Sequence, residues 1–231
     1  MTDRLIRIAH RRVFNCYLVV EDDGLTLVDT GPAGALPAIR AGIERLEAPL
    51  RRVVLTHAHG DHLGGLDQLA DDHGDALEVI AGRREAQLFH GDFTLRDGEP
   101  VPAPSPRNYG RPRTQPSRLV DDGDHVGSLK VIATPGHTPG HIALIDTRDG
   151  SLIAGDALTT IGRVAVSGDL VWRWPFPARS TWNKELAIHS AQRLRDQQPT
   201  RLATGHGPVV YSATTAIDRA LDRVRARADV R

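Results

Sequence analysis

The chain has 231 residues, of which 40% are hydrophobic and 25% charged, the composition of an ordinary globular protein that needs no disulfides. Its 29 basic and 29 acidic residues give a formal net charge of zero, which argues against a dedicated nucleic-acid or membrane-surface binder. No apolar run approaches the roughly 18 residues of a membrane helix. The opening MTDRLIRIAH has no apolar secretory segment, so we expect a cytoplasmic protein.

The N-terminal half is expected to alternate strands and helices. Residues 13–20 and 25–28 are apolar runs separated by a turn, which predicts a β-hairpin. Residues 35–47 carry apolar side chains at helical spacing. The remaining elements expected in this half are two strands and a helix, at 53–55, 77–81 and 63–73.

Residues 96–118 form an insert of different composition. It contains six of the 15 prolines, namely Pro100, Pro102, Pro104, Pro106, Pro112 and Pro116. Alternating prolines exclude both a helix and a central strand. We therefore expect an extended surface loop, which is either a passive linker or a lid over a pocket.

The C-terminal half is rich in predicted strands. Apolar runs predict strands at 129–133, 142–146, 151–154 and 202–203, and helices at 182–195 and 213–228. Because strands followed by helices occur in both halves, we expect an α/β (α+β) fold of two mixed sheets with the helices outside. A single domain over residues 1–231 is predicted to hold them.

The 11 histidines are clustered, and the densest cluster follows a predicted strand. His57, His59 and His62 fall within six residues, and Asp61 lies among them. His57 and His59 are two positions apart at a strand end, so both side chains point to the same side. Imidazole nitrogens and carboxylate oxygens are preferred ligands of divalent metals, so the cluster predicts a metal site.

Three further candidate ligands each follow a short predicted strand and have glycine neighbours: His137, Asp156 and His206. The carboxyl ends of strands that meet at one sheet edge are where open α/β folds place active sites. The complete set of candidate ligands is His57, His59, Asp61, His62, His137, Asp156 and His206. Seven donors exceed one tetrahedral ion and suit two ions that share a bridging carboxylate.

The motifs THAHGDHLGG, PGHTPGH, GD and GHG occur in an order and spacing that resemble the metallo-β-lactamase superfamily. LVDTG at 27–31 is similar to the first motif of that family, and the resemblance spans about residues 13–210. It implies a four-layer αβ/βα sandwich of two mixed β-sheets with outer helices. It also implies a dinuclear site at the edge between the sheets.

The resemblance assigns a role to each candidate ligand by position. His57, His59 and His137 resemble the ligands of the first metal, whereas Asp61, His62 and His206 resemble those of the second. Asp156 resembles the bridging carboxylate.

Three further residues gain a role from the same resemblance. Asp29 resembles an aspartate that braces the metal loop, and His141 resembles a supporting residue. Some quorum-lactone hydrolases of the family use a tyrosine near the metals, and Tyr109 in the insert is the candidate for that catalytic role here.

Two divalent ions, with zinc expected and iron or manganese also suited to these ligands, hold a bridging water and lower its pKa toward ~7. The resulting hydroxide attacks a carbonyl carbon while one ion polarises the oxygen. Asp61 is the candidate that carries a proton to the leaving group. The resemblance thus implies a dinuclear metal-dependent hydrolase.

The presence of Asp156 favours the wider hydrolases of the family, namely lactonases, thioesterases and phosphodiesterases, because true β-lactamases of this fold usually lack the bridging aspartate. Zero net charge and the lack of a long basic arm speak against the nuclease members, so a small lactone, ester or thioester is the expected substrate. β-Lactamase and phosphodiesterase activities stay open as alternatives. An iron-dependent oxidoreductase of the same superfamily, similar to persulfide dioxygenases, is another. A metal-stabilised binding protein without turnover is the alternative outside the enzymes.

Three aromatic residues lie within residues 172–176, although aromatic residues make up only 4% of the chain. Trp172, Trp174 and Phe176 alternate, so in an extended segment they face one way. They are predicted either to line an apolar wall of the substrate pocket or to cover an edge of the core.

Overall fold

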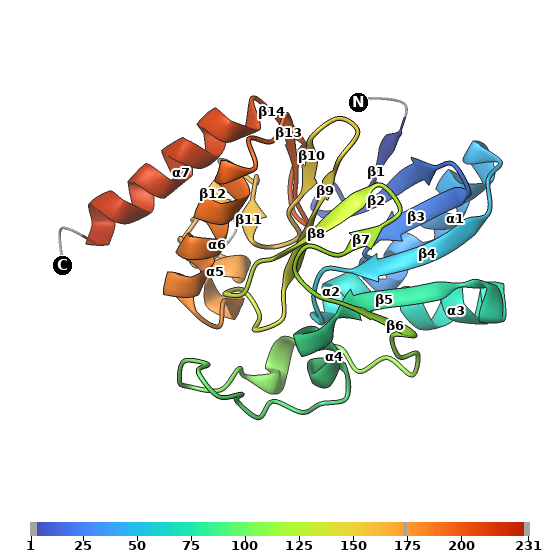
Figure 1. The fold of residues 1–231 in the computed structure, drawn as a ribbon, viewed down its shortest axis with the longest axis horizontal. Coiled ribbons are helices and arrows are strands. Elements are labelled where there is room, and N and C mark those ends of the chain that lie inside the picture. The colour runs from blue at the N-terminus through green and yellow to red at the C-terminus, as the bar shows by residue number, and fades with distance from the viewer. Residues whose placement is uncertain (1–3, 173–174, 229–231) are drawn as a thin grey trace. The chain divides into compact units, whose positions relative to one another are not determined.

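The computed structural model describes residues 4–172 and 175–228 (Figure 1). The chain divides into two compact units, Met1–Phe93 with Pro106–Val120, and Thr94–Ser105 with Asp121–Arg231. Each unit contains one six-stranded sheet, and both sheets mix parallel and antiparallel pairs. This confirms the predicted α/β (α+β) class with two mixed sheets. The assignment of all 231 residues to a single domain stays a prediction, and the 96–118 insert is shared between the units.

The sheet of the first unit has the strand order β1-β2-β3-β4-β5-β6. Its first three strands are antiparallel neighbours, and β3 to β6 run parallel. The strands are β1 (Leu5–His10), β2 (Phe14–Glu21), β3 (Gly24–Val28), β4 (Leu50–Leu55), β5 (Glu78–Gly82) and β6 (Arg118–Val120). The predicted hairpin is confirmed as β2 and β3, because the Asp-Asp-Gly turn separates two apolar runs.

Helices pack on the first sheet through their apolar faces. They are α1 (Leu36–Leu46), α2 (Gly60–Leu63), α3 (Leu66–His73) and α4 (Arg83–Phe89). Ile39 of α1 and Leu69 of α3 join the same buried cluster as Leu27 of β3 and Leu55 of β4. The predicted helix over 63–73 is interrupted near Gly64 and Gly65, where the chain passes close to Pro32 and Ala33.

The sheet of the second unit has the order β14-β13-β10-β9-β8-β7. Its strands are β7 (His125–Val126), β8 (Leu129–Ala133), β9 (Ile142–Asp146), β10 (Ser151–Ile153), β13 (Arg201–Ala203) and β14 (Val210–Tyr211). A separate small ribbon pairs β11 (Leu158–Thr159) with β12 (Ala165–Val166). Because β8 and β10 are both antiparallel to β9, and β13 is parallel to β10, the strands β8, β10 and β13 all point the same way.

Three helices belong to the second unit, α5 (Phe176–Ser180), α6 (Lys184–Asp196) and α7 (Ala213–Ala228). Ala191 of α6 and Ile217 of α7 lie fully buried in one apolar cluster with Leu152 and Leu202 of the sheet. The predicted helix over 182–195 thus begins two residues later, where the Asn183 side chain accepts a hydrogen bond from the Leu186 N–H and caps it. Among the described residues, none of the helices is both long and apolar enough to cross a membrane.

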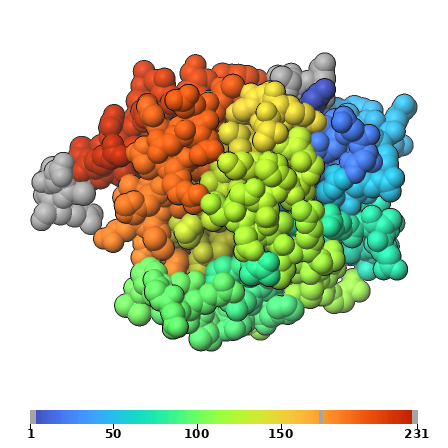
Figure 2. Space-filling model, in the orientation of Figure 1, coloured from blue at the N-terminus to red at the C-terminus, as the bar shows by residue number. Residues whose placement is uncertain are grey.

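The proline-rich insert runs along the surface, as its prolines predict (Figure 2, green). Between Thr94 and Ser117 its regular structure is one short 3-10 turn at Pro106–Asn108. In the second unit the Trp182 indole N–H donates a hydrogen bond to the Pro102 carbonyl (2.8 Å). In the first unit the amides of Arg113 and Thr114 donate to Asp67 (3.1 and 2.8 Å).

Candidate metal centre

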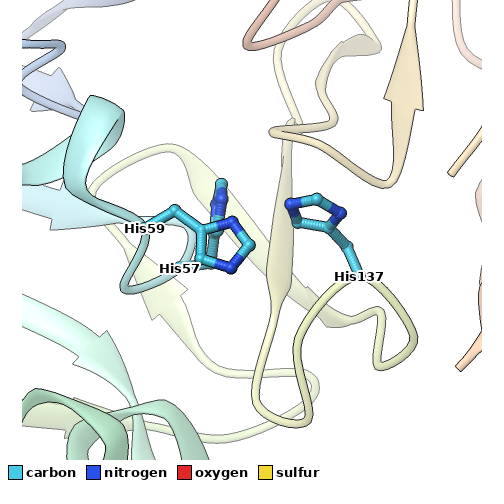
Figure 3. A group of neighbouring side chains, drawn as sticks. All are labelled: His57, His59 and His137. Carbon is cyan, nitrogen blue, oxygen red and sulfur yellow. The ribbon is translucent and has the colours of Figure 1, made fainter. Parts of the chain in front are cut away.

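The first half of the candidate site lies in the first unit, at the carboxyl end of β4. Fully buried His57 follows this strand, and His59 (4% exposed) directly precedes α2, which contains half-buried Asp61 and buried His62. Ring centroids of His57 lie 4.7 Å from those of His59 and 4.1 Å from those of His62. Figure 3 shows the side chains of His57 and His59 on this loop. The structure therefore gathers three of the predicted ligands in one buried cluster.

Asp29 holds this loop from the neighbouring strand. It directly follows β3, which is parallel to β4, so both residues lie at the same sheet edge. Its Oδ1 accepts a hydrogen bond from the Thr56 N–H (2.8 Å), and its Oδ2 accepts from the Thr56 hydroxyl (2.8 Å) and from His62 Nδ1 (2.8 Å). The predicted bracing contact is thus present in the structure.

These contacts decide which ring nitrogen carries the proton on two histidines. A carboxylate only accepts, so His62 Nδ1 and the Thr56 hydroxyl both donate to Asp29. Thr56 Oγ1 has then given its one hydrogen, so at 3.0 Å it accepts from His57 Nδ1. A neutral imidazole protonated on Nδ1 keeps its lone pair on Nε2, the form that binds a metal.

Two residues of the first unit support the same loop. Glu85, in α4 after β5, is fully buried, and its Oε1 accepts a hydrogen bond from the Ala58 N–H (2.7 Å). Tyr109 of the insert packs its ring edge-on to His59, with centroids 4.8 Å apart, and to Phe93 at 5.0 Å. Burial, and then the nearby Glu85 carboxylate, raise the pKa of the Tyr109 phenol, which therefore stays protonated at neutral pH.

The second half of the candidate site lies in the second unit, at the carboxyl ends of β8, β10 and β13. Figure 3 shows His137 on the loop after β8. Asp156 Oδ2 lies 3.0 Å from His206 Nε2 and 3.6 Å from His137 Nε2, and all three side chains are buried. The Gly205 N–H donates to the Gly155 carbonyl (2.9 Å), so the two loops are held side by side. One carboxylate oxygen thus lies close to two imidazole nitrogens.

His141 uses both ring nitrogens within the protein. Its Nε2 accepts a hydrogen bond from the Asp156 N–H (3.0 Å), and its Nδ1 lies 2.7 Å from Thr134 Oγ1. Because Nε2 is an acceptor here, the neutral ring is protonated on Nδ1, which donates to the threonine. His141 therefore orients the backbone of Asp156 and has no free lone pair for a metal.

The structure thus places the predicted ligands in two groups, one in each unit. Their donor set of imidazole nitrogens and carboxylate oxygens fits zinc, iron or manganese, and the Nδ1 hydrogen bonds of His57 and His62 direct the lone pair to Nε2. Sequence reasoning did not single out Thr56, although this residue directly precedes His57. It offered no signal for Glu85, because α4 buries a charged face and lacks a clear apolar period.

The aromatic segment is not extended throughout, because Phe176 begins α5. Trp172 is 90% exposed and Phe176 is 59% exposed, so neither covers a core edge in the second unit. Trp174 lies outside the described residues. The proposed apolar wall therefore stays a prediction, without the alternation that an extended strand provides.

The sequence matches the family model of the metallo-beta-lactamase superfamily over residues 12–206. The chain belongs to this superfamily. Its histidine and aspartate clusters and its two mixed sheets, predicted from motif order and strand pattern, agree with this membership.

Several relatives match this chain over most of their own length. An uncharacterised protein of Bacillus subtilis, YobT, is 44% identical over 91% of this chain and 90% of its own. A probable metallo-hydrolase of the same organism, YflN, is 28% identical over 84% of this chain and 80% of its own. A hydroxyacylglutathione hydrolase of Francisella philomiragia is 26% identical over 85% and 77% of the two chains.

Solved structures share the fold. The protein TTHA1623, crystallised in a di-iron-bound form, superposes with a TM-score of 0.67 at 24% identity over 90% of this chain and 95% of that one. The B3 metallo-beta-lactamase BLEG-1 superposes with a TM-score of 0.66 at 22% identity over 91% and 95%. This likeness confirms the metallo-β-lactamase fold expected from the motifs.

Proposed function

We propose that the chain is a dinuclear metal-dependent hydrolase of lactones, esters or thioesters. His57, His59 and His137 would hold one divalent ion, and Asp61, His62 and His206 would hold the second. Asp156 would bridge the two. When bound, the ions supply a water of lowered pKa and polarise the substrate oxygen.

The observation that carries the proposal is the position of the Asp156 carboxylate. Its Oδ2 lies within 3.6 Å of Nε2 atoms from two histidines that arrive on different strands. A buried carboxylate that lies between two imidazole nitrogens concentrates negative charge and donor atoms at one point, and a bound cation would compensate that charge. The His141 contact to the Asp156 N–H fixes the loop, so this carboxylate is held in place beforehand.

The roles of the other residues follow from their contacts. Asp29 and Thr56 keep the Nε2 lone pairs of His57 and His62 available. Asp61, half-buried in α2, is proposed to pass a proton to the leaving group. Tyr109 keeps its phenolic proton and lies beside His59, so it is proposed to donate a hydrogen bond to the substrate.

The substrate class rests on relatives and on Asp156. A hydroxyacylglutathione hydrolase and several probable metallo-hydrolases resemble this chain over most of its length. With Asp156 among their ligands, two bound ions would supply a water of lowered pKa and polarise a carbonyl oxygen. The solved β-lactamases resemble the chain below 25% identity and support the fold alone.

The test is a substrate panel on protein of defined metal content. Metal-free protein is reloaded with zinc, iron or manganese, the bound ions are counted, and rates are measured on lactones, thioesters, phosphodiesters and β-lactams. We expect two ions per chain and the highest rates on lactones or thioesters. His59→Ala and Asp156→Ala should each lower bound metal and abolish activity.

His189→Ala is the matched control, because His189 is an exposed histidine in α6 outside the candidate site. It should keep wild-type metal content and rate. A wild-type protein that binds at most one ion, or a His59→Ala variant that keeps full metal and full rate, would contradict the proposal.

Iron-dependent oxidation is the second candidate function, because imidazole nitrogens and carboxylate oxygens also bind iron. The same ligand types hold iron, so the donor set does not separate the two functions. Oxygen uptake with persulfide substrates by the iron-loaded protein, in the absence of hydrolysis by any loaded form, would select this alternative.

A further inference from the structure

Three hydroxyl and carbonyl groups form a chain behind His137, inside the second unit. His137 Nδ1 lies 2.9 Å from Ser167 Oγ, and Ser167 Oγ lies 2.8 Å from Thr181 Oγ1. Thr181 Oγ1 lies 2.6 Å from the Pro177 carbonyl oxygen. Ser167 comes from the end of the small β11–β12 ribbon, and Thr181 comes from the connection between α5 and α6.

The acceptor at the end of this chain sets the direction of every proton in it. A carbonyl oxygen has no hydrogen, so the Thr181 hydroxyl donates to Pro177. Thr181 has then used its one hydrogen, so Ser167 donates to Thr181. Ser167 in turn has no hydrogen left for His137, so His137 Nδ1 must carry the proton and donate to Ser167.

The same distances disfavour the opposite hydrogen-bond direction, in which Ser167 donates to His137. If Ser167 donated to His137, the oxygens of Ser167 and Thr181 would face each other at 2.8 Å with no hydrogen between them. Ser167 is 3% exposed and His137 is 1% exposed, so bulk water is not available to relieve that contact. The hydrogen-bond chain therefore favours one tautomer of His137.

The backbone around Thr181 holds the same loop in place. The Trp182 N–H donates to the His137 carbonyl (3.0 Å), and the Asn183 N–H donates to the Gly136 carbonyl (2.8 Å). An added Cβ on Gly136 would lie 2.3 Å from the Ala187 nitrogen, so this turn abuts the first turn of α6. Residues 181–183 thus fix both the position of the His137 backbone and the proton on its ring.

We propose that Ser167 and Thr181 are positioning residues that hold the His137 ring with its lone pair on Nε2, the nitrogen directed toward Asp156. This inference rests on the proposed function, because it assigns the residues that prepare His137 as a ligand. The inference requires the hydroxyl group of Thr181. With a side chain of the same shape but without that oxygen, the Ser167 hydroxyl would be able to donate its hydrogen to His137.

The experiment compares Thr181→Val with Thr181→Ser. Nitrogen-15 NMR of metal-free protein, at a pH where the ring is neutral, reports which nitrogen of His137 is protonated, and a His137→Asn sample assigns the signals. We expect the wild type and Thr181→Ser to be protonated on Nδ1. Thr181→Val should show a mixture of both tautomers, and its zinc affinity should fall about tenfold or more.

Ser167→Ala is the second variant, and it keeps the test decisive if Thr181→Val does not fold. It removes the acceptor of the His137 proton, so it should also mix the tautomers and weaken zinc binding. Tautomer and zinc affinity that stay at wild-type values in the folded variants would overturn the inference, and so would a tautomer change without a change in affinity. A wild type that is protonated on Nδ1 and binds no metal would instead refute the proposed function and leave the proton direction standing.

Discussion

The Asp29 carboxylate accepts a hydrogen bond from Nδ1 of His62 at 2.8 Å, although 33 positions separate the two residues in the chain. Asp29 adopts a left-handed backbone with φ of 58°, which aspartate tolerates better than most residues. The turn after β3 thus directs a carboxylate into the loop after β4. One side chain thereby sets the protonation pattern of two candidate ligands.

Asp29→Asn should weaken metal binding about 10- to 100-fold with little effect on the fold. Asparagine has the same shape and also tolerates the left-handed backbone, but its NH₂ group would face a donor at Thr56 or His62. Zinc affinity measured by competition with a chelating dye is the readout. Asp75→Asn, on an exposed turn, is the control, and equal affinities for the two variants would contradict this role.

Gly136→Ala should destabilise the protein by at least about 2 kcal/mol more than Gly123→Ala. Both glycines have positive φ, 141° and 90°, so both variants carry backbone strain. An added Cβ on Gly136 would overlap the Ala187 backbone, whereas nothing lies within 4 Å of one added on Gly123. Urea unfolding measures the difference, and equal midpoints would show that α6 does not constrain the His137 turn.

Trp182→Phe should make the insert easier to cleave with trypsin at Arg96. The substitution keeps an aromatic ring but removes the indole N–H that donates to the Pro102 carbonyl, a hydrogen bond of about 1 kcal/mol. The fraction of molecules in which residues 94–105 have detached should therefore rise several-fold. Mass spectrometry of the fragments locates the cut. Cleavage at an unchanged rate would mean that other contacts hold residues 94–105.

Cys16 should resist thiol reagents in the folded protein at neutral pH. It is 1% exposed, and burial followed by the nearby Asp29 charge raises the pKa of its thiol well above the usual value. Modification by Ellman's reagent should therefore be complete in denaturant and negligible before unfolding. Rapid labelling of native protein would show that β2 opens readily.

Local patterns in the sequence were sufficient for the elements that carry the site. The hairpin of β2 and β3, the amphipathic α1 and the strands before each ligand follow from apolar runs and their spacing. The order of the histidine motifs identified the family, whereas the supporting role of His141 stays a prediction. These features depend on residues that are close together in the chain, so they can be predicted from one sequence.

Tertiary packing decided what holds the ligands. Glu85 and Ala58 are 27 positions apart in the chain, and Ser167 and His137 are 30 positions apart. No local spacing pattern therefore predicts either contact. Phe176 begins a helix instead of continuing an extended segment, although its neighbours alternate in sequence. A short-range pattern determines which helix, strand or loop carries a residue. The hydrogen bonds of its side chain depend on which distant donor or acceptor the fold brings within about 3 Å.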